Sequence, residues 1–209
     1  QVGWMHRYEH YIVVTLVAAM LLAGPALAPP LARRMPAFAA IACLAAGAAF
    51  LPKLLTWYIL SPRTIHLQQA QMARFARDFL PLPVAVNDLG YVAFRNDAYV
   101  LDLWGLGSAE TRRLRLSGQT PEGWANPLAV KHGVAFAMIY DSWFATAGGS
   151  DWVRMAELHL DGPHGPIGDT VVTFYAVGRD MVQPLRTALD GFAAMLPEGA
   201  RLVSVEVFE

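Results

Sequence analysis

Two long apolar stretches follow the first ten residues of the chain, and a regular alternation of polar and apolar positions appears only after them. Tyr11–Ala32 and Met35–Pro52 contain no charged residue. A helix crosses a bilayer with about 20 apolar residues. The second stretch reaches this length by continuing to Trp57 and Tyr58, whose aromatic rings suit the membrane boundary. We therefore expect a membrane anchor over residues 1–62, with two transmembrane helices at about 11–30 and 36–59.

A short connection, Pro29–Pro36, separates the two stretches and holds Arg33 and Arg34. Basic residues favour the cytoplasmic side of a membrane. We expect this connection to be a cytoplasmic hairpin tip, with both ends of the anchor and the following domain on the outside. The alternative is a buried helical hairpin in a soluble protein.

The segment Thr64–Leu80 mixes polar and apolar positions with helical spacing. It predicts an amphipathic connecting helix over 63–81 that packs on its own domain or lies on the lipid surface; packing on its own domain is the commoner outcome. The polar positions are His66, Gln68, Gln69, Gln71, Arg74 and Arg77, and the apolar ones are Ile65, Ala73, Ala76 and Phe79.

The remaining residues, 82–209, alternate between strand and helix patterns and predict an α/β domain with a mixed sheet flanked by helices. The expected strands are Val84–Val86, Tyr99–Leu103, Val134–Tyr140, Trp152–Leu160, Thr170–Val177 and Leu202–Phe208. The expected helices begin after Ser108, cover Pro127–His132 and cover Met181–Leu196.

Composition agrees with a membrane part followed by a water-soluble part. Hydrophobic residues make up 55% of the chain and charged residues 16%. A net charge of −1 argues against a nucleic-acid partner. Cys43 is the only cysteine, so no internal disulfide can form. The chain begins with Gln1, and a second apolar stretch follows the first, so we expect a processed or partial polypeptide.

Acidic residues follow the apolar strands of the predicted sheet. Asn87 and Asp88 come after the first strand, Asp102 lies in the second, and Asp141 follows the third. Ligands of open α/β sheets bind where strands end. These residues therefore predict a site for a divalent cation, a sugar hydroxyl or a reacting proton. The alternative is that each carboxylate caps a helix or braces a turn.

Two further motifs have chemical alternatives. The run from His6 to His10, with Glu9 between, matches the H-x-x-E-H pattern of zinc peptidases. The alternative is an interfacial cluster in which Arg7 and Glu9 meet lipid headgroups or an anionic ligand. A second run of basic residues predicts a phosphate clamp, or else a solvated helix face. Its members are Arg112, Arg113 and Arg115.

Common catalytic motifs are missing from the sequence. There is no G-x-S-x-G nucleophile elbow and no G-x-x-x-x-G-K-[ST] phosphate loop. A G-x-G-x-x-G dinucleotide fingerprint after a strand is also missing. Catalysis therefore cannot be assigned from motifs of these kinds.

The strand-end motifs resemble the C-terminal extracytoplasmic domain of bacterial polytopic glycosyltransferases of the GT-C class. In such proteins a helix pair leads into a small α/β domain that carries V-A-x-x-D-x-G and then V-x-D-L-x-G-L. Here these motifs are Val84–Gly90 and Val100–Leu106. The triplet Arg7, Tyr8 and Glu9 is similar to the R-Y-E that related sequences place before a membrane helix on the outer side.

This resemblance implies sugar transfer from a polyprenyl-phosphate donor to an extracytoplasmic acceptor, in a bacterial inner membrane with the α/β domain on the periplasmic side. The decisive acidic loop of the class lies outside this chain. The resemblance implies donor or acceptor contacts from Arg7, Tyr8, Glu9, Asn87, Asp88 and Asp102. The alternative function is a non-catalytic accessory or scaffold subunit that binds other membrane proteins.

Overall fold

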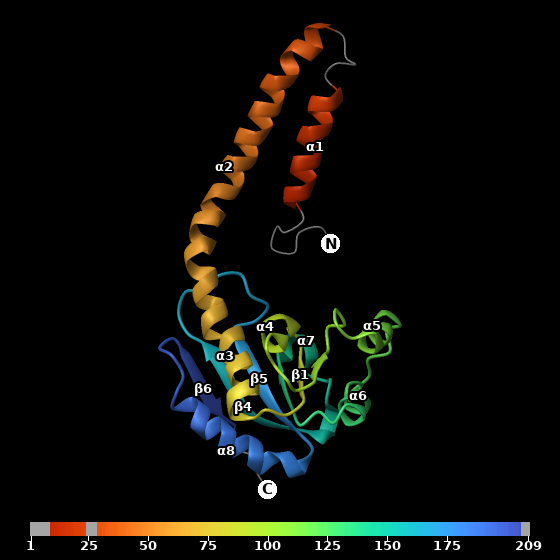
Figure 1. Ribbon diagram of the computed structural model, residues 1–209, viewed down its shortest axis with the longest axis vertical. Helices are drawn as coiled ribbons and strands as arrows, with labels where there is room; N and C mark the ends of the chain where they lie inside the picture. Colours follow the sequence, from red (N-terminus) through yellow and green to blue (C-terminus); the bar gives the residue numbers. More distant parts are fainter. Residues whose placement is uncertain (1–8, 24–28, 206–209) are drawn as a thin grey trace. The chain divides into compact units, whose positions relative to one another are not determined.

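A six-stranded mixed sheet with helices on both faces organises residues 60–205 in the computed structural model, which describes residues 9–23 and 29–205 (Figure 1). The strand order is β2-β1-β3-β5-β4-β6. The predicted α/β class with a mixed sheet is confirmed. The strands are β1 Val84–Val86, β2 Val100–Asp102, β3 Phe136–Ile139, β4 Trp152–Leu160, β5 Val171–Val177 and β6 Ala200–Ser204.

Helices connect these strands and precede them. The α-helices are α1 Glu9–Ala23, α2 Pro29–Leu67, α3 Gln69–Arg74, α4 Leu89–Ala93, α5 Ala109–Leu116, α6 Asn126–Lys131, α7 Asp141–Phe144 and α8 Val182–Ala193. A π-helix, η3 Phe75–Phe79, follows α3. Two 3₁₀ turns, η4 Gly149–Asp151 and η5 Arg179–Met181, precede β4 and α8.

The directions of the strands determine which strand ends meet at the same edge of the sheet. β1 pairs in parallel with β2 and with β3. β5 is antiparallel to both β3 and β4, so β4 runs in the same direction as β3. The C-terminal ends of β1, β2, β3 and β4 therefore meet at one edge, which we call the carboxyl edge.

Two hydrophobic cores hold the helices against the sheet. The first lies under α3, η3, α4 and α8 and is centred on Phe75, whose side chain is fully buried. The Phe75 ring lies 5.0 Å from the ring of Phe174 and 5.1 Å from that of Phe192, centroid to centroid. The second core lies under α5, α6 and α7 and includes Trp124 and Phe144.

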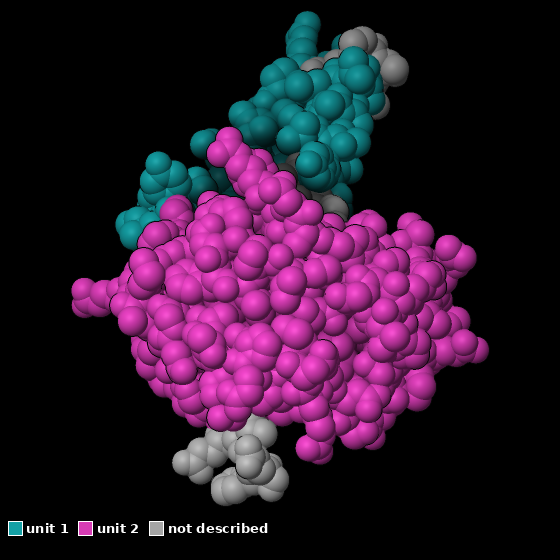
Figure 2. Space-filling view, turned by 60° about the horizontal axis from the view of Figure 1, so that its bottom comes forward, with its two compact units in different colours: residues 1–59 teal, residues 60–209 magenta. Residues whose placement is uncertain are grey.

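The chain forms two compact units, Gln1–Ile59 and Leu60–Glu209 (Figure 2). Among the described residues, one helix is long and apolar enough to cross a membrane. It lies within Arg33–Phe79 and has a mean hydropathy of 1.9 in its most apolar window. α1 has 15 residues, fewer than the roughly 20 that a span needs. The expectation of two transmembrane helices is therefore not confirmed.

The predicted connection Pro29–Pro36 is wrong, because α2 already begins at Pro29 and includes Arg33 and Arg34. Proline is tolerated in the first turn of a helix, where the missing N–H would have no partner. Pro29 and Pro30 therefore start the helix that they were expected to precede. The two arginines lie on a helix and not in a hairpin loop.

The amphipathic pattern predicted for 63–81 is partly correct: Ala73 and Ala76 are buried as expected, but other positions differ. Ile65 is 41% exposed, whereas Gln68, Gln69 and Gln71 are buried. Backbone angles at Gln68 depart from helical values and separate α2 from α3. The segment packs on the sheet, as expected, but its polar glutamines face inward because they find hydrogen-bond partners there.

Four strands differ from their predicted bounds. β3 covers Phe136–Ile139, shorter than the expected Val134–Tyr140, and β5 begins at Val171, one residue later than expected. β2 begins at Val100 and ends at Asp102, shorter than the expected Tyr99–Leu103. β6 begins at Ala200, because Ala200 pairs with Leu160 of β4, and it ends at Ser204. Residues 206–208 of the predicted last strand lie outside the described residues.

Replacing Phe75 by Ala should lower the free energy of unfolding by about 3–5 kcal/mol, because a large cavity would open in the first core. Phe94→Ala is the matched control, since Phe94 is 62% exposed; its loss should stay within about 0.5 kcal/mol. Chemical denaturation in mild detergent measures both variants. Equal losses would show that Phe75 is not a centre of packing.

Candidate functional site

The carboxyl edge brings the predicted strand-end residues together. Register pairs Val86 of β1 with Asp102 of β2 and with Met138 of β3. Asn87 and Asp88 directly follow β1, and Asp141 begins α7 just after β3. Asp88 and Asp102, expected at the ends of two strands, therefore share one edge of the sheet, and Asp141 lies at the same edge. Their individual contacts differ.

Asp102 braces a turn. Its side chain is buried, with 1% exposed. Oδ1 accepts a hydrogen bond from the backbone N–H of Trp104 at 2.8 Å, and Oδ2 accepts one from that of Gly107 at 2.6 Å. Both carboxylate oxygens are therefore engaged by the loop that follows β2. Of the two interpretations of Asp102, a ligand site or a carboxylate that braces a turn, the structure therefore favours the second.

Asp88 is the most available acid of the edge. It is the N-cap of α4, and Oδ1 accepts a long hydrogen bond of 3.4 Å from the backbone N–H of Gly90. Its side chain is exposed, and Oδ2 accepts no hydrogen bond from the described residues. Asp88 can therefore cap the helix and still bind a hydroxyl group with its second oxygen.

Asp141 belongs to a network of polar side chains. Oδ1 accepts a hydrogen bond from the Tyr175 hydroxyl at 2.8 Å, and Oδ2 pairs with Arg154 at 2.9 Å. Burial and the hydrogen bond to Asp141 raise the pKa of Tyr175 above its ordinary value, so its hydroxyl stays protonated and donates. The network continues from Arg154 through Glu157 to His159.

A buried amide cluster lies between α3 and the ends of β1 and β3. Asn87 Oδ1 accepts a hydrogen bond from the backbone N–H of Tyr140 at 2.8 Å. The Tyr140 hydroxyl donates to Gln68 Oε1 at 2.6 Å and accepts from Gln69 Nε2 at 3.3 Å. Burial raises the pKa of Tyr140 above its ordinary value, and the negative charge of Asp88 adds to this shift.

Two atoms of this cluster have no partner among the described residues. They are Gln69 Oε1 and Asn87 Nδ2, in side chains that are 5% and 4% exposed. A buried polar atom without a partner costs about 1–3 kcal/mol. Buried polar atoms left unpaired therefore call for an explanation, and a bound polar group is one.

Sequence reasoning missed Gln68, Gln69 and Tyr140 as parts of the site. The available signal was the run of glutamines at 68, 69 and 71 in a segment otherwise patterned for burial. Tyr140 was expected only as the last residue of a strand. Its role depends on Gln68, which lies 72 residues earlier in the chain.

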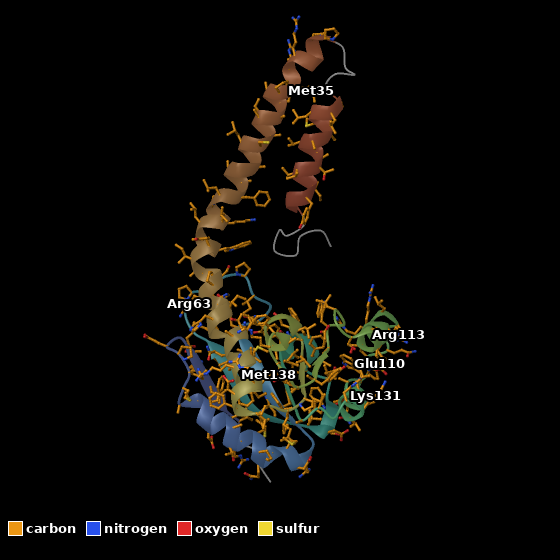
Figure 3. All side chains as sticks on the ribbon, in the orientation of Figure 1. Met35, Arg63, Glu110, Arg113, Lys131 and Met138 are labelled. Atoms are coloured by element: carbon orange, nitrogen blue, oxygen red, sulfur yellow. The ribbon has the colours of Figure 1, made fainter. Side chains whose placement is uncertain are left out.

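α2 enters the α/β unit at the carboxyl edge, beside the loop that joins β4 to β5. Thr64 Oγ1 accepts a hydrogen bond from the backbone N–H of Gly165 at 2.8 Å. Arg63 donates to the carbonyl oxygens of Pro163 and Asp161, at 2.8 and 3.1 Å (Figure 3). The last two turns of α2 are thus fixed at the edge that carries Asp88.

The three arginines of the predicted phosphate clamp do not act as a unit. Arg115 donates to the Trp104 carbonyl at 2.6 Å, and its guanidinium lies 4.1 Å from the Trp104 ring centroid. This cation–π contact fixes α5 to the second core. Arg112 and Arg113 are exposed. The alternative of a solvated helix face fits these two residues.

The proposed zinc and R-Y-E motifs fall at the start of the chain. His6, Arg7 and Tyr8 lie outside the described residues. Glu9 and His10 begin α1, and only their backbone is described. In the part of the chain that the structure describes, no three His, Cys, Asp or Glu side chains are grouped as metal ligands would be.

Replacing Asp102 by Ala should lower the free energy of unfolding by roughly 2–4 kcal/mol, because two backbone amides lose a charged acceptor. Asp88→Ala should cost about 1 kcal/mol, as is typical of a helix N-cap. Guanidinium denaturation measures both variants. A larger loss for Asp88 than for Asp102 would contradict the assigned roles.

Replacing Tyr140 by Phe should lower the free energy of unfolding by about 1–3 kcal/mol, because two buried glutamines lose their shared partner. Tyr99→Phe is the control, since Tyr99 is 44% exposed; its effect should stay within about 0.5 kcal/mol. The same denaturation assay compares the two variants. If both are equally stable, the amide cluster does not contribute to folding.

Comparison with known proteins places this site within a family that has no assigned activity. No curated protein and no solved structure matches the chain. A family model described as a domain of unknown function (DUF8728) matches residues 62–175, more than half of the chain. The matched region includes the amide cluster, Asp88 and Asp102. The chain therefore belongs to the DUF8728 family.

Proposed function

We propose that this chain is the C-terminal part of a membrane glycosyltransferase that transfers a sugar from a polyprenyl-phosphate donor to an extracytoplasmic acceptor. One observation carries the proposal: the apolar helix α2 enters the α/β unit at the edge that carries Asp88. The apolar part of α2 directly precedes Arg63 and Thr64, so with that part in a membrane the edge to which these two residues bind is close to the lipid by chain connection. A lipid-linked donor presents its sugar at the lipid surface.

The resemblance to GT-C glycosyltransferases adds to this observation. Both strand-end motifs, Val84–Gly90 and Val100–Leu106, end at the carboxyl edge. The proposal keeps the membrane anchor of two helices, in which α1 accompanies α2. It also keeps the bacterial inner membrane and the periplasmic side for the α/β unit.

In the proposed reaction an acceptor hydroxyl attacks the anomeric carbon of the donor sugar. A carbon–oxygen bond to the acceptor forms, the bond to the polyprenyl phosphate breaks, and the hydroxyl proton passes to a base. The base of this class lies in a loop outside this chain. Asp88 binds and orients the sugar, because its Oδ2 accepts a hydrogen bond from a sugar hydroxyl.

The unpaired atoms of the amide cluster suit the same role. Asn87 Nδ2 can donate a hydrogen bond, and Gln69 Oε1 can accept one. A hydroxyl group can both donate and accept. The cluster adjoins Asp88, because Asp88 directly follows Asn87. Both atoms are buried, so a sugar hydroxyl would have to enter the cluster to reach them.

A non-catalytic accessory subunit is the second candidate. The observation in its favour is that two of the strand-end acids serve the structure, since Asp102 braces a turn and Asp141 pairs with Arg154. α2 also exposes large apolar side chains, such as Ile41 and Leu44, that helices of other membrane subunits can cover.

Replacing Asp88 by Asn should lower the rate of sugar transfer roughly 10- to 100-fold, as the loss of a charged hydrogen-bond acceptor predicts. Asn still caps a helix, so folding is kept. The measurement is the release of polyprenyl phosphate from a panel of polyprenyl-phosphate-linked sugars in native membranes. Asp97→Asn, an exposed change just before β2, is the matched control.

The two candidates give opposite results in this experiment. If Asp88→Asn releases polyprenyl phosphate as fast as the unchanged protein, Asp88 is not part of the site. If the unchanged protein releases none and co-purifies with another membrane protein at a fixed ratio in mild detergent, the subunit is the correct assignment.

A further inference from the structure

α5 carries an exposed surface that combines leucine with arginine. Leu106, in the loop before α5, is 83% exposed, and Leu116, at the end of α5, is 77% exposed. Arg112 and Arg113 lie between them and are also exposed. We call these four residues the α5 surface. Among the described residues of the α/β unit, Leu106 and Leu116 are the two most exposed large apolar side chains.

Helical spacing places these side chains on one face. Leu116 follows Arg112 by four residues and Arg113 by three, so the three share the outward face of α5. Leu114 and Arg115 face the second core instead. Leu106 lies beside this face, because the backbone at Gly105 approaches the backbone of Arg112 closely.

The α5 surface lies on the carboxyl edge. α5 follows the C-terminal end of β2, and Gly107 in the connecting loop packs against Leu89 at the start of α4. Figure 1 shows α4, α5 and α7 along this side of the sheet. It is the same edge at which Thr64 and Arg63 fix the end of α2.

The charge of this surface is positive. Glu110 is the only acidic residue of α5, and it pairs with Lys131 of α6 at 2.9 Å. Figure 3 shows Glu110 near Lys131, with Arg113 on the outer side of α5. Arginines beside exposed leucines are typical of segments that lie in the membrane interface and bind anionic headgroups.

We propose that the α5 surface rests on an anionic phospholipid bilayer, with Leu106 and Leu116 among the headgroups and Arg112 and Arg113 on lipid phosphates. The inference relies on the membrane placement of α2 in the proposed function. It adds a second point of attachment beside the α2 junction. Two attachments would hold the carboxyl edge, with Asp88, against the lipid.

The single cysteine allows a direct test. In a Cys43→Ser background, Ala109→Cys places an environment-sensitive fluorophore on the outward face of α5 and leaves the four residues unchanged. Val130→Cys is the control, because Val130 is 70% exposed and precedes β3 at the opposite edge. The full chain is reconstituted in phosphatidylcholine vesicles with phosphatidylglycerol and brominated acyl chains. Quenching by bromine reports contact with lipid.

The Ala109 probe should be quenched far more than the Val130 probe. The Arg112→Glu/Arg113→Glu variant should lower the ratio of lipid-bound to free probe by about fivefold or more for each arginine, and 1 M salt should act in the same direction. Arg186→Glu, an exposed change on α8, should have no effect. Equal quenching at Ala109 and Val130 would overturn the inference.

Labelling Cys43 in the unchanged protein separates this inference from the proposed function. If the Cys43 probe is quenched and the Ala109 probe is not, α2 is in the membrane and the α5 surface is not. If the Cys43 probe is not quenched, the membrane placement fails, and the inference fails with it. If the fluorescence of the Ala109 probe shows an apolar environment but bromine does not quench it, a protein partner covers the α5 surface. That result would overturn the proposed lipid contact.

Discussion

Parallel pairing of β1 with both of its neighbours is the constraint on which the candidate site depends. β1 has only three residues, yet it aligns the ends of β2 and β3 at one edge. The alignment continues past the strands. Leu103 donates to the Val86 carbonyl at 2.8 Å, and Asn87 Oδ1 accepts from the backbone of Tyr140. The side-chain amide of Asn87 thus continues the hydrogen bonding between β1 and β3 beyond their last backbone pair.

The same amide cluster joins α3 and the residue before it to the sheet. Gln68 and Gln69 meet the Tyr140 hydroxyl, and Gln68 Nε2 also donates to the Asp169 carbonyl at 2.9 Å. Hydrogen bonds are directional, whereas apolar contacts tolerate sliding. The hydrogen bonds of the amide cluster therefore set the rotation of α3 about its axis and the position of the last turns of α2. A lipid-facing role for the carboxyl edge depends on that position.

Much of the site could be predicted from the sequence, but the roles of its residues could not. The acids after short apolar runs indicated one edge of a sheet, because parallel strands end together. Whether a carboxylate is engaged depends on the fold around it. Both carboxylate oxygens of Asp102 accept hydrogen bonds from the turn that ends at Gly107. At Asp88, by contrast, only Oδ1 accepts a hydrogen bond from the described residues. The same local pattern, an acidic residue followed by a glycine, therefore gives a fully hydrogen-bonded carboxylate at Asp102 and a partly available one at Asp88.

By itself the sequence determined the class of the protein: a long apolar helix, an α/β unit with a mixed sheet, and acids at the strand ends. These features are local, since they follow from hydrophobic period, turn residues and length. The tertiary structure alone decided that glutamines of the connecting helix face inward and that Arg115 lies over Trp104. Such choices depend on partners far away in the sequence, which no local pattern contains.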